Sequence, residues 1–338
     1  MNARKEILSD ALQRMQGVPV LVIGDVMLDR YIWGIVDRIS AEAPVPVVKV
    51  KRIEERLGGA GNVIHNLRNV GAEVSICGYV GNDDEGTKVL SLFRDLKVNT
   101  DGVMVDSARP TTVKTRVIAH QQQVVRIDRE DPPSEECPLD TSLDEQLCEH
   151  ISKQLQKYRV IVVSDYAKGA ITERIMNMLE GASKDNKISL AERPLVVDPH
   201  PEHYHLYRCM SVGKPNRKEA EAVSGVRIKS PESAGRAAEI LIDKWKADAM
   251  LISLGEDGLL IARRSVKPHL VLPTQAREVS DVSGAGDTVT AIFAAALGAG
   301  AGHEIAGELA NIAAGVVVSE VGTTPVDLAK MKRQIARL

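Results

Sequence analysis

The sequence has few cysteines, and no two of them are closely spaced. The four are Cys77, Cys137, Cys148 and Cys209. Without a Cys-x-x-Cys motif, the chain shows no pattern for a zinc knuckle, a redox dithiol or a disulfide framework. We therefore expect four inert thiols.

The sequence also lacks an excess of either charge and any long apolar run. Its 43 Lys and Arg residues nearly balance its 46 Asp and Glu residues, which gives a formal net charge of −3. The cations are scattered, and this argues against a nucleic-acid partner. The longest apolar stretch, around 291–298, is far shorter than the ~20 residues of a membrane-spanning helix. Because residues 1–17 lack a secretory-signal pattern, we expect a cytoplasmic protein with no membrane partner.

Short apolar runs and helical patterns alternate along the chain. The runs lack polar alternation, which is typical of strands buried on both faces of a parallel sheet. They lie at 18–26, 74–81, 159–166, 194–199 and 249–255. Helical patterns between them predict a doubly wound, mainly parallel α/β sheet flanked by helices. With 338 residues of ordinary soluble composition, we expect one large domain over 1–338 that carries insertions.

Two segments break this alternation. Residues 30–53 and 111–130 are rich in β-branched residues with partial polar alternation, which predicts antiparallel strands. We expect them to form a small β lid over the strand ends, where open α/β sheets bind ligands. An isolated small sheet leaves one face and its edges unprotected. We therefore expect a homodimer in which a second subunit covers the lid.

The segment "DVSGAGDTVTAIF" begins with a glycine-rich turn that feeds an apolar helix. Gly284, Ala285 and Gly286 let the backbone approach a ligand, and the helix points its free N–H groups and positive dipole end at the same place. This pattern predicts an anion hole. Asp287 then stands beside the bound anion, where it can accept a proton from a hydroxyl during phosphoryl transfer. Alternatively, Asp287 only complements the helix dipole, and this segment alone leaves both readings open.

A second glycine-rich entry to a helix, "ERLGGAGNVIHNL", occupies residues 55–67. Its Asn62 can donate and accept hydrogen bonds with sugar hydroxyls. Asp25 and Asp29 follow a buried run, where a carboxylate is able to fix a polyol. These features indicate an acceptor site for a sugar.

The second half of the chain carries features suited to a nucleotide. Asn216 and Glu219 are three residues apart, so on a helical turn both face one side and suit a hydrated magnesium ion near phosphates. In "SLGEDG", Gly255 and Gly258 close a strand with an open turn. Each of these features is weak evidence for a function when taken alone. Together, in this order along the chain, they are highly specific.

Taken together, these motifs resemble the PfkB or ribokinase family of sugar kinases over essentially the whole chain. "GGAGN" (58–62) and "DVSGAGD" (281–287) are similar to the two signatures of that family. The resemblance implies a ribokinase-like fold, with Asp287 as catalytic base and residues 284–286 as anion hole. It implies sugar contacts by Asp29, Gly58, Gly59 and Asn62. It implies nucleotide contacts by Asn216, Ser253, Gly255, Gly258 and Asn311, with Glu219 serving Mg²⁺.

Within the family, three segments most resemble bacterial D-glycero-β-D-manno-heptose 7-phosphate kinases: residues 26–50, "QQQVVRIDRE" and "SDYAKGAIT". That resemblance implies ATP-dependent phosphorylation of the anomeric hydroxyl to the 1,7-bisphosphate, on the route to ADP-heptose and lipopolysaccharide core. It implies a substrate phosphate, for which Arg116, Arg126 and Lys168 are the candidate contacts. Ordinary solvated charges are the alternative for each. ATP and Mg²⁺ are the implied cofactors, and dependence on a monovalent cation stays open.

The sequence departs from the family pattern at two places. His200 stands where a lysine usually follows Asp-Pro, and Val282-Ser283 replaces a threonine pair while keeping one hydroxyl. The sequence also lacks the His-x-Gly-His-type motif of the nucleotidyltransferase half of bifunctional relatives, so we expect the kinase alone. Another sugar or sugar-phosphate kinase of the family fits the signatures too. A sugar sensor without turnover is less consistent, since it is expected to lose the base or the magnesium residues.

Overall fold

The computed structural model describes residues 2–120, 122–134, 138–184, 192–275, 281–320 and 322–338. Its main sheet has nine strands in the order β13-β12-β11-β10-β9-β8-β1-β4-β5. The five apolar runs are confirmed as strands: β1 (Pro19–Gly24), β4 (Glu73–Gly81), β8 (Val160–Ser164), β9 (Leu195–Asp198) and β11 (Ala249–Ser253). The other strands are β5 (Asn99–Asp106), β10 (Val212–Gly213), β12 (Leu259–Arg263) and β13 (Val266–Leu272).

The sheet is parallel from β11 to β5 and antiparallel at the opposite edge, where β12 and β13 form a hairpin. The mainly parallel sheet is therefore confirmed, with an antiparallel edge that the apolar runs did not predict. β12 is buried except at Arg263, whereas the outermost strand β13 is exposed over its first three residues and only partly buried over the next three. Exposed edge strands such as β13 carry polar residues and escape a search for continuous apolar runs.

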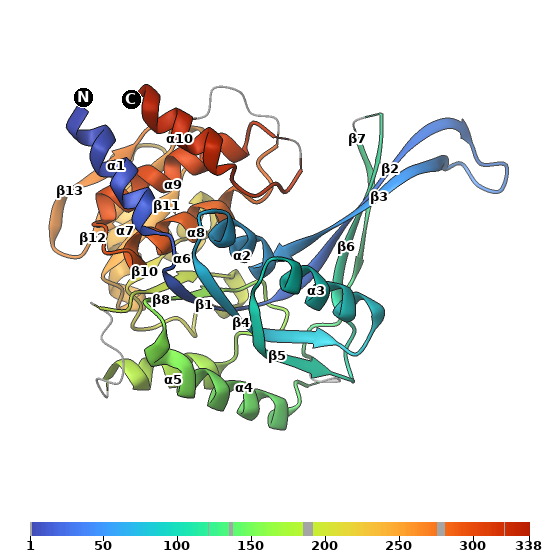
Figure 1. The fold of residues 1–338 in the computed structure, drawn as a ribbon, viewed down its shortest axis with the longest axis horizontal. Coiled ribbons are helices and arrows are strands. Elements are labelled where there is room, and N and C mark those ends of the chain that lie inside the picture. The colour runs from blue at the N-terminus through green and yellow to red at the C-terminus, as the bar shows by residue number, and fades with distance from the viewer. Residues whose placement is uncertain (1, 121, 135–137, 185–191, 276–280, 321) are drawn as a thin grey trace.

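Helices cover both faces of the sheet (Figure 1). One face holds α1 (Asn2–Arg14), α2 (Ala60–Asn69), α3 (Asp84–Asp95), α8 (Ala285–Gly298), α9 (His303–Val317) and α10 (Leu328–Arg337). The other holds α4 (Thr141–Gln154), α5 (Glu173–Lys184), α6 (Arg217–Ser224) and α7 (Pro231–Trp245). Strand β1 serves both cores because its side chains alternate: Val20 and Val22 pack on the first face, Leu21 and Ile23 on the second.

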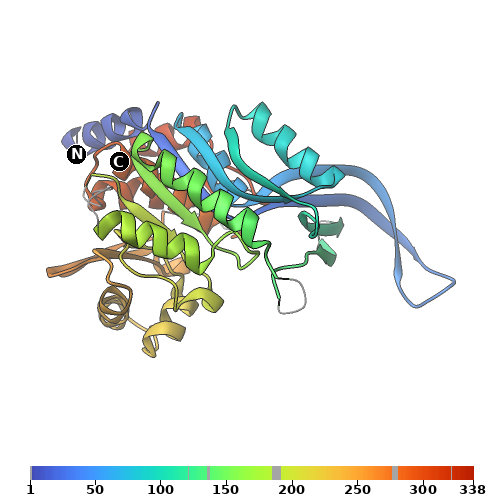
Figure 2. The same ribbon diagram turned by 90° about the horizontal axis from the view of Figure 1, so that it is seen from below.

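The two lid segments form a separate four-stranded sheet in the order β3-β2-β6-β7. Its strands are β2 (Val26–Ile39), β3 (Pro46–Gly59), β6 (Thr112–Ala119) and β7 (Gln122–Arg129). Each hairpin is antiparallel as expected, but the central pair β2–β6 is parallel. The β2–β3 hairpin is longer than predicted, because β2 follows β1 after one residue and β3 runs directly into α2. This hairpin projects away from the main sheet (Figures 1 and 2).

In the described ranges, every helix falls short of the length and apolar character needed to cross a bilayer. Cys77, Cys148 and Cys209 are free thiols. Cys137 lies outside the described residues.

Candidate active site

The two glycine-rich signatures meet at the N-terminus of α8. Gly284 is the N-cap of that helix with φ of 77°, a left-handed conformation that favours glycine. A Cβ on Gly284 would lie 2.7 Å from Nδ2 of Asn62. That Nδ2 donates a hydrogen bond of 2.7 Å to Oδ2 of Asp287. Residues separated by 225 positions therefore belong to one site.

Asp287 has the surroundings of a general base. It is buried, and it accepts a second hydrogen bond of 2.6 Å at Oδ1 from the Tyr166 hydroxyl. Burial raises the pKa of Asp287 to about 6, and the negative charge of Asp198 adds to this rise. The hydrogen bonds from Tyr166 and Asn62 act in the opposite direction. Asp287 is thus ionised at neutral pH but close enough to its pKa to take up a proton.

The hydrogen bonds of Asp287 go to other elements rather than to the first turn of α8. Asn62 comes from α2 and Tyr166 from the loop after β8. A residue that only capped the helix would bond the free N–H groups of its own first turn. The geometry therefore favours the base over the dipole-capping reading.

Sequence reasoning missed three residues that surround this carboxylate: Tyr166, Asp198 and Lys214. Lys214 follows β10 and is only 4% exposed. Its Nζ lies 2.8 Å from Oδ2 of Asp198. A Cβ on Gly286 would lie 3.0 Å from the same Nζ. No sequence motif singled out Lys214, so only its burial in the folded protein reveals its position in the site.

The predicted sugar contact Asp29 lies on β2, beside the glycines of the first signature. It is buried, and a Cβ on Gly58 would lie 2.7 Å from its Oδ2. Gly59 has φ of 56°, and a Cβ there would meet the backbone oxygen of Asp25 at 2.6 Å. The structure thus brings Asp29, Gly58 and Gly59 together. Both glycines are required by close approach of the chain.

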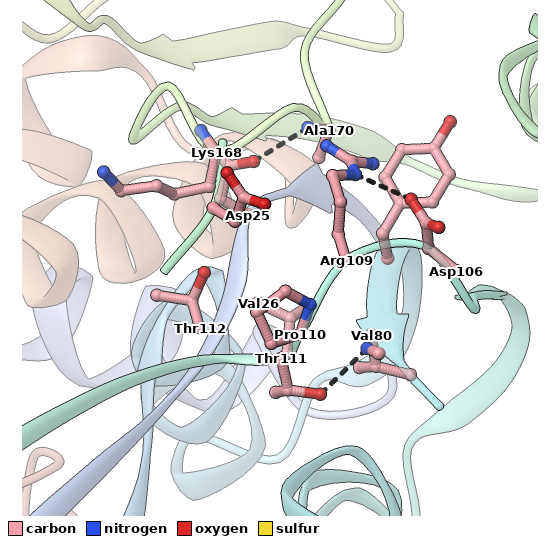
Figure 3. A pocket seen from close by; sticks show the side chains of 13 residues that line it. Asp25, Val26, Val80, Asp106, Arg109, Pro110, Thr111, Thr112, Lys168 and Ala170 are labelled. Carbon is pink, nitrogen blue, oxygen red and sulfur yellow. Dashed lines mark hydrogen bonds and ion pairs between the residues drawn. The ribbon is translucent and has the colours of Figure 1, made fainter. Parts of the chain in front are cut away.

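Asp25, in contrast, holds the protein's own backbone. Its carboxylate accepts N–H bonds from Tyr166, Lys168 and Ala170 at 2.7, 3.1 and 2.8 Å. Burial and the nearby Asp165 raise the pKa of Asp25 to about 6. Asp25 lines a small cavity of about 30 Å³, which has room for about one water molecule. Figure 3 shows Asp25 among the residues that line this cavity. Asp25 therefore fixes the loop after β8 rather than a polyol.

Two of the three candidate phosphate contacts lie on one face of the lid. Arg116 on β6 and Arg126 on β7 are direct register partners. Like charges in that arrangement destabilise a sheet unless anions offset them. Arg116 donates to Oδ1 of Asp29 at 2.6 Å, and Arg126 donates to Asp128 at 2.9 Å. Arg116 is mostly buried whereas Arg126 is half exposed.

The third candidate, Lys168, reaches the same face from the loop after β8. Its Nζ donates to Glu130 at 2.9 Å. Lys114, which the sequence did not single out, lies 3.7 Å from Glu130 and 3.8 Å from Asp128. The register pairs Asp29 with Lys114, and Lys114 with Asp128. This face of the lid is thus a continuous strip of paired charges beside Asp29.

On the other side of the site, Asn216 and Glu219 begin α6. They form a capping box: Glu219 N donates to Asn216 Oδ1 at 3.0 Å, and Asn216 N donates to Glu219 Oε2 at 2.8 Å. Asn216 also forms a parallel bridge with Ser253 at the end of β11. Burial raises the pKa of Glu219. These three predicted nucleotide residues are therefore adjacent, and the first two also stabilise the helix.

The other residues predicted to contact the nucleotide are Gly255, Gly258 and Asn311. Gly255 and Gly258 have φ of 66° and 93°, and a Cβ on Gly258 would meet the Leu272 oxygen at 2.0 Å. Open space surrounds the Cβ position of Gly255. Asn311 on α9 donates from Nδ2 to the oxygen of Pro273 at 2.7 Å. Only glycine therefore fits at Gly258, while Gly255 leaves room for a ligand.

The donor set fits a hydrated Mg²⁺. Within the described ranges, no three His, Cys, Asp or Glu side chains are grouped so as to hold a metal ion by themselves. Mg²⁺ usually keeps several waters and uses one or two carboxylates together with substrate phosphates. Glu219 has lone pairs beyond the one used by Asn216 N. His200 does not supply the positive charge of the lysine that usually follows Asp-Pro in the family, because burial lowers the pKa of the His200 imidazole.

Comparisons with known proteins identify the family to which the chain is similar. Residues 19–330 match the model of the pfkB family carbohydrate kinases. The chain is 43% identical over 333 residues to the bifunctional protein HldE of Pelobacter propionicus, covering 98% of this chain and 66% of that protein. It is 44% identical over 315 residues to the bifunctional protein HldE of Geobacter metallireducens, covering 93% and 62%. The chain thus spans about two thirds of the length of these relatives.

Solved structures share the fold at low sequence identity. The Arabidopsis thaliana ribokinase complexed with ribose and ATP has a TM-score of 0.71 and 20% identity, over 96% of this chain and 100% of that one. The tetrameric inhibited form of phosphofructokinase-2 from Escherichia coli has a TM-score of 0.75 and 17% identity, over 95% and 99%. These likenesses confirm a ribokinase-like fold.

Proposed function

The chain belongs to the pfkB family of carbohydrate kinases, and from this premise we propose its reaction. In the cytoplasm, the protein transfers the terminal phosphoryl group of ATP to the anomeric hydroxyl of D-glycero-β-D-manno-heptose 7-phosphate. The product is the 1,7-bisphosphate, a precursor for ADP-heptose and lipopolysaccharide core. Residues 1–338 act as one kinase domain.

The observation that carries this proposal is the position of Asp287 at the start of α8. Its carboxylate is buried and held by Asn62 and Tyr166, in the first turn of the helix that Gly284 caps. A phosphoryl group at this helix end is stabilised by the N–H groups and the dipole. The acceptor hydroxyl loses its proton to Asp287 as its oxygen bonds to phosphorus. Asp29 orients the sugar from the lid side.

The strip of charges on the lid supports a substrate that already carries a phosphate. Arg116, Arg126 and Lys168 are all held by carboxylates, which keeps them in place in the absence of ligand. A phosphate between Arg116 and Arg126 relieves the repulsion of two facing cations. An unphosphorylated sugar offers no such compensation.

The nucleotide occupies the other side, with Asn216 and Ser253 near its phosphates and Asn311 farther along. Glu219 would hold a hydrated Mg²⁺, which would neutralise phosphate charge. The chain spans 62–66% of its bifunctional relatives, and we attribute to it only the kinase reaction. A second candidate is a kinase acting on another sugar phosphate, which the same charged strip favours.

Steady-state assays with ATP, Mg²⁺ and a panel of acceptors test this function. The panel comprises heptose 7-phosphate, unphosphorylated heptose, ribose and fructose 6-phosphate. We expect kcat/KM for heptose 7-phosphate to exceed that for unphosphorylated heptose by about 10²-fold, since phosphate contacts are charge-assisted. Phosphorus NMR of the product identifies the anomeric position. If unphosphorylated heptose or ribose is an equally good acceptor, the assignment is wrong, and preference for fructose 6-phosphate supports the second candidate.

We propose further that the lid mediates a homodimer. The register aligns an apolar row across all four of its strands, formed by Ile53, Ile32, Val117 and Val125. This row lies on the face opposite Asp29, and Ile53 and Val125 at its ends are 58% and 46% exposed. A small sheet with an apolar open face is stabilised when another surface covers it.

Sedimentation of the wild type at micromolar concentration is expected to show a dimer. Val125→Asp is expected to give monomers, because it places a charge in the covered apolar row. Val266→Asp is the matched control, since Val266 is similarly exposed but lies on β13 of the main sheet. A wild-type protein that sediments only as a monomer contradicts the proposal.

A further inference from the structure

Lys214 is a buried cation in the middle of the site, and the proposed function assigns it no role. Its ammonium pairs with Asp198 at 2.8 Å. The charges of Glu219 and Asp287 also act on it, and all three carboxylates raise the pKa of Lys214 against the effect of burial. Lys214 is therefore charged. Burying a lysine this completely is costly unless anionic groups compensate its charge.

The position of the ammonium relates it to both substrates. On one side it lies against Gly286, in the turn that begins α8. On the other side its charge reaches Glu219, the residue placed near the nucleotide phosphates. An ammonium has three N–H donors. Within the described ranges its one ion pair is with Asp198, which leaves donors for a ligand.

We propose that Lys214 is a catalytic residue that contacts the phosphoryl group during its transfer. This rests on the proposed kinase function. Asp198 holds the ammonium in position, and Asp198 is fixed in turn by the hydroxyl of Thr290 at 2.9 Å. Lys214 and the N–H groups of α8 then bind the equatorial oxygens of the moving group from two sides.

The reaction balances without any other reactant. The bond between the γ-phosphorus and the β–γ bridging oxygen of ATP breaks, and a bond from the sugar oxygen to the same phosphorus forms. The hydroxyl proton goes to Asp287, and the bridging oxygen leaves with ADP. Lys214 keeps its proton throughout and stabilises negative charge on the phosphoryl oxygens.

A purely electrostatic role is the alternative to be tested. Lys214 lowers the pKa of Asp287 whereas Asp198 raises it. If Lys214 acts only in this way, its removal raises the pKa of the base and shifts the acid limb of the pH profile upward. Activity then recovers at high pH, where Asp287 is ionised in any variant. Direct contact with the phosphoryl group predicts a loss that high pH does not restore.

The first experiment is Lys214→Met, with kcat measured from pH 5 to about pH 9, well above the ordinary range of a carboxyl group. We expect the acid limb to move to higher pH and kcat on the high-pH plateau to fall by about 10²–10³-fold, comparable to loss of one transition-state hydrogen-bond donor. Arg174→Met is the control. It removes a cation that pairs with Asp144 between α5 and α4, outside the site, and should retain kcat within about 5-fold.

A double variant that removes both charges distinguishes a loss of catalysis from a loss of folding. Deleting one partner of a buried ion pair is strongly destabilising, whereas replacing both is often tolerated. The double variant Lys214→Met/Asp198→Asn should therefore fold and bind ADP. We expect it to be as inactive as the single variant.

Binding provides a readout that does not need turnover or the identity of the sugar. Calorimetry with Mg²⁺ compares ADP alone with ADP plus aluminium fluoride, a mimic of the moving phosphoryl group. We expect Lys214→Met to keep its affinity for ADP and to lose about 10²-fold or more for the fluoride complex. Equal affinity for that complex, or a plateau kcat within about 5-fold of wild type, would overturn the role of Lys214. Failure of the wild type on every acceptor refutes the proposed function instead.

Discussion

Asp287→Asn is expected to lower kcat by about 10²–10⁴-fold while ATP and sugar binding are largely kept. Asparagine has nearly the same shape, so the helix, the anion hole and the contact with Asn62 have little reason to change. It has no basic oxygen to accept the proton of the acceptor hydroxyl. The expected product is a folded, ligand-binding, inactive protein, which calorimetry and steady-state assays identify.

The pH profile of the wild type adds a second signature. The pKa of Asp287 is about 6, so the base is ionised above that pH and becomes protonated as the pH falls through it. Wild-type kcat should therefore decline below about pH 6. The residual activity of Asp287→Asn should lack this decline, because asparagine does not titrate.

Asp327→Asn is a suitable control. Asp327 is the N-cap of α10, and its side chain accepts from the backbone N–H groups of Ala329 and Lys330. Loss of its charge should lower stability slightly and leave turnover normal. If Asp287→Asn behaves in the same way, Asp287 is a helix cap and the mechanism proposed for the second signature fails.

Arg116→Glu is expected to raise KM for the phosphorylated sugar by about 10²–10³-fold. The change removes a donor at the predicted phosphate contact and places a negative charge where an anion binds. It also breaks the ion pair with Asp29, so some loss is expected with any sugar. The ratio of kcat/KM for the sugar with and without its phosphate isolates the phosphate contact.

Arg129→Glu controls for the charge change. Arg129 lies on β7 and pairs with Asp83 and Glu85. Its register partner on β6 is Val113, which is adjacent in sequence to Lys114, and adjacent strand residues face opposite sides of a sheet. Arg129 therefore points to the other face of the lid, and KM should change little. If Arg116→Glu reduces kcat/KM equally for phosphorylated and unphosphorylated sugar, Arg116 acts only through Asp29.

The amino-acid sequence by itself determined the parallel sheet and the residues of both glycine signatures. Apolar runs without alternation identified five strands, because burial on both faces removes the polar positions. Gly284 and Gly59 were recognisable because positive φ and close approach require glycine. Asp287 was recognisable because a carboxylate in the first turn after such glycines is chemically informative. These features are local, and a short window of sequence contains them.

Only the tertiary structure decided which charges share the site. Asn62 and Asp287 are 225 positions apart, and Tyr166 and Asp287 are 121 apart. Asp25 and Asp29 looked equivalent in sequence, but the loop after β8 bonds one and the lid presents the other. The sequence did not single out Lys214, and the order β8, β9, β10 places it against Asp198. The physical reason is that local patterning fixes burial and turns, whereas strand order sets the distances between charges on which pKa and catalysis depend.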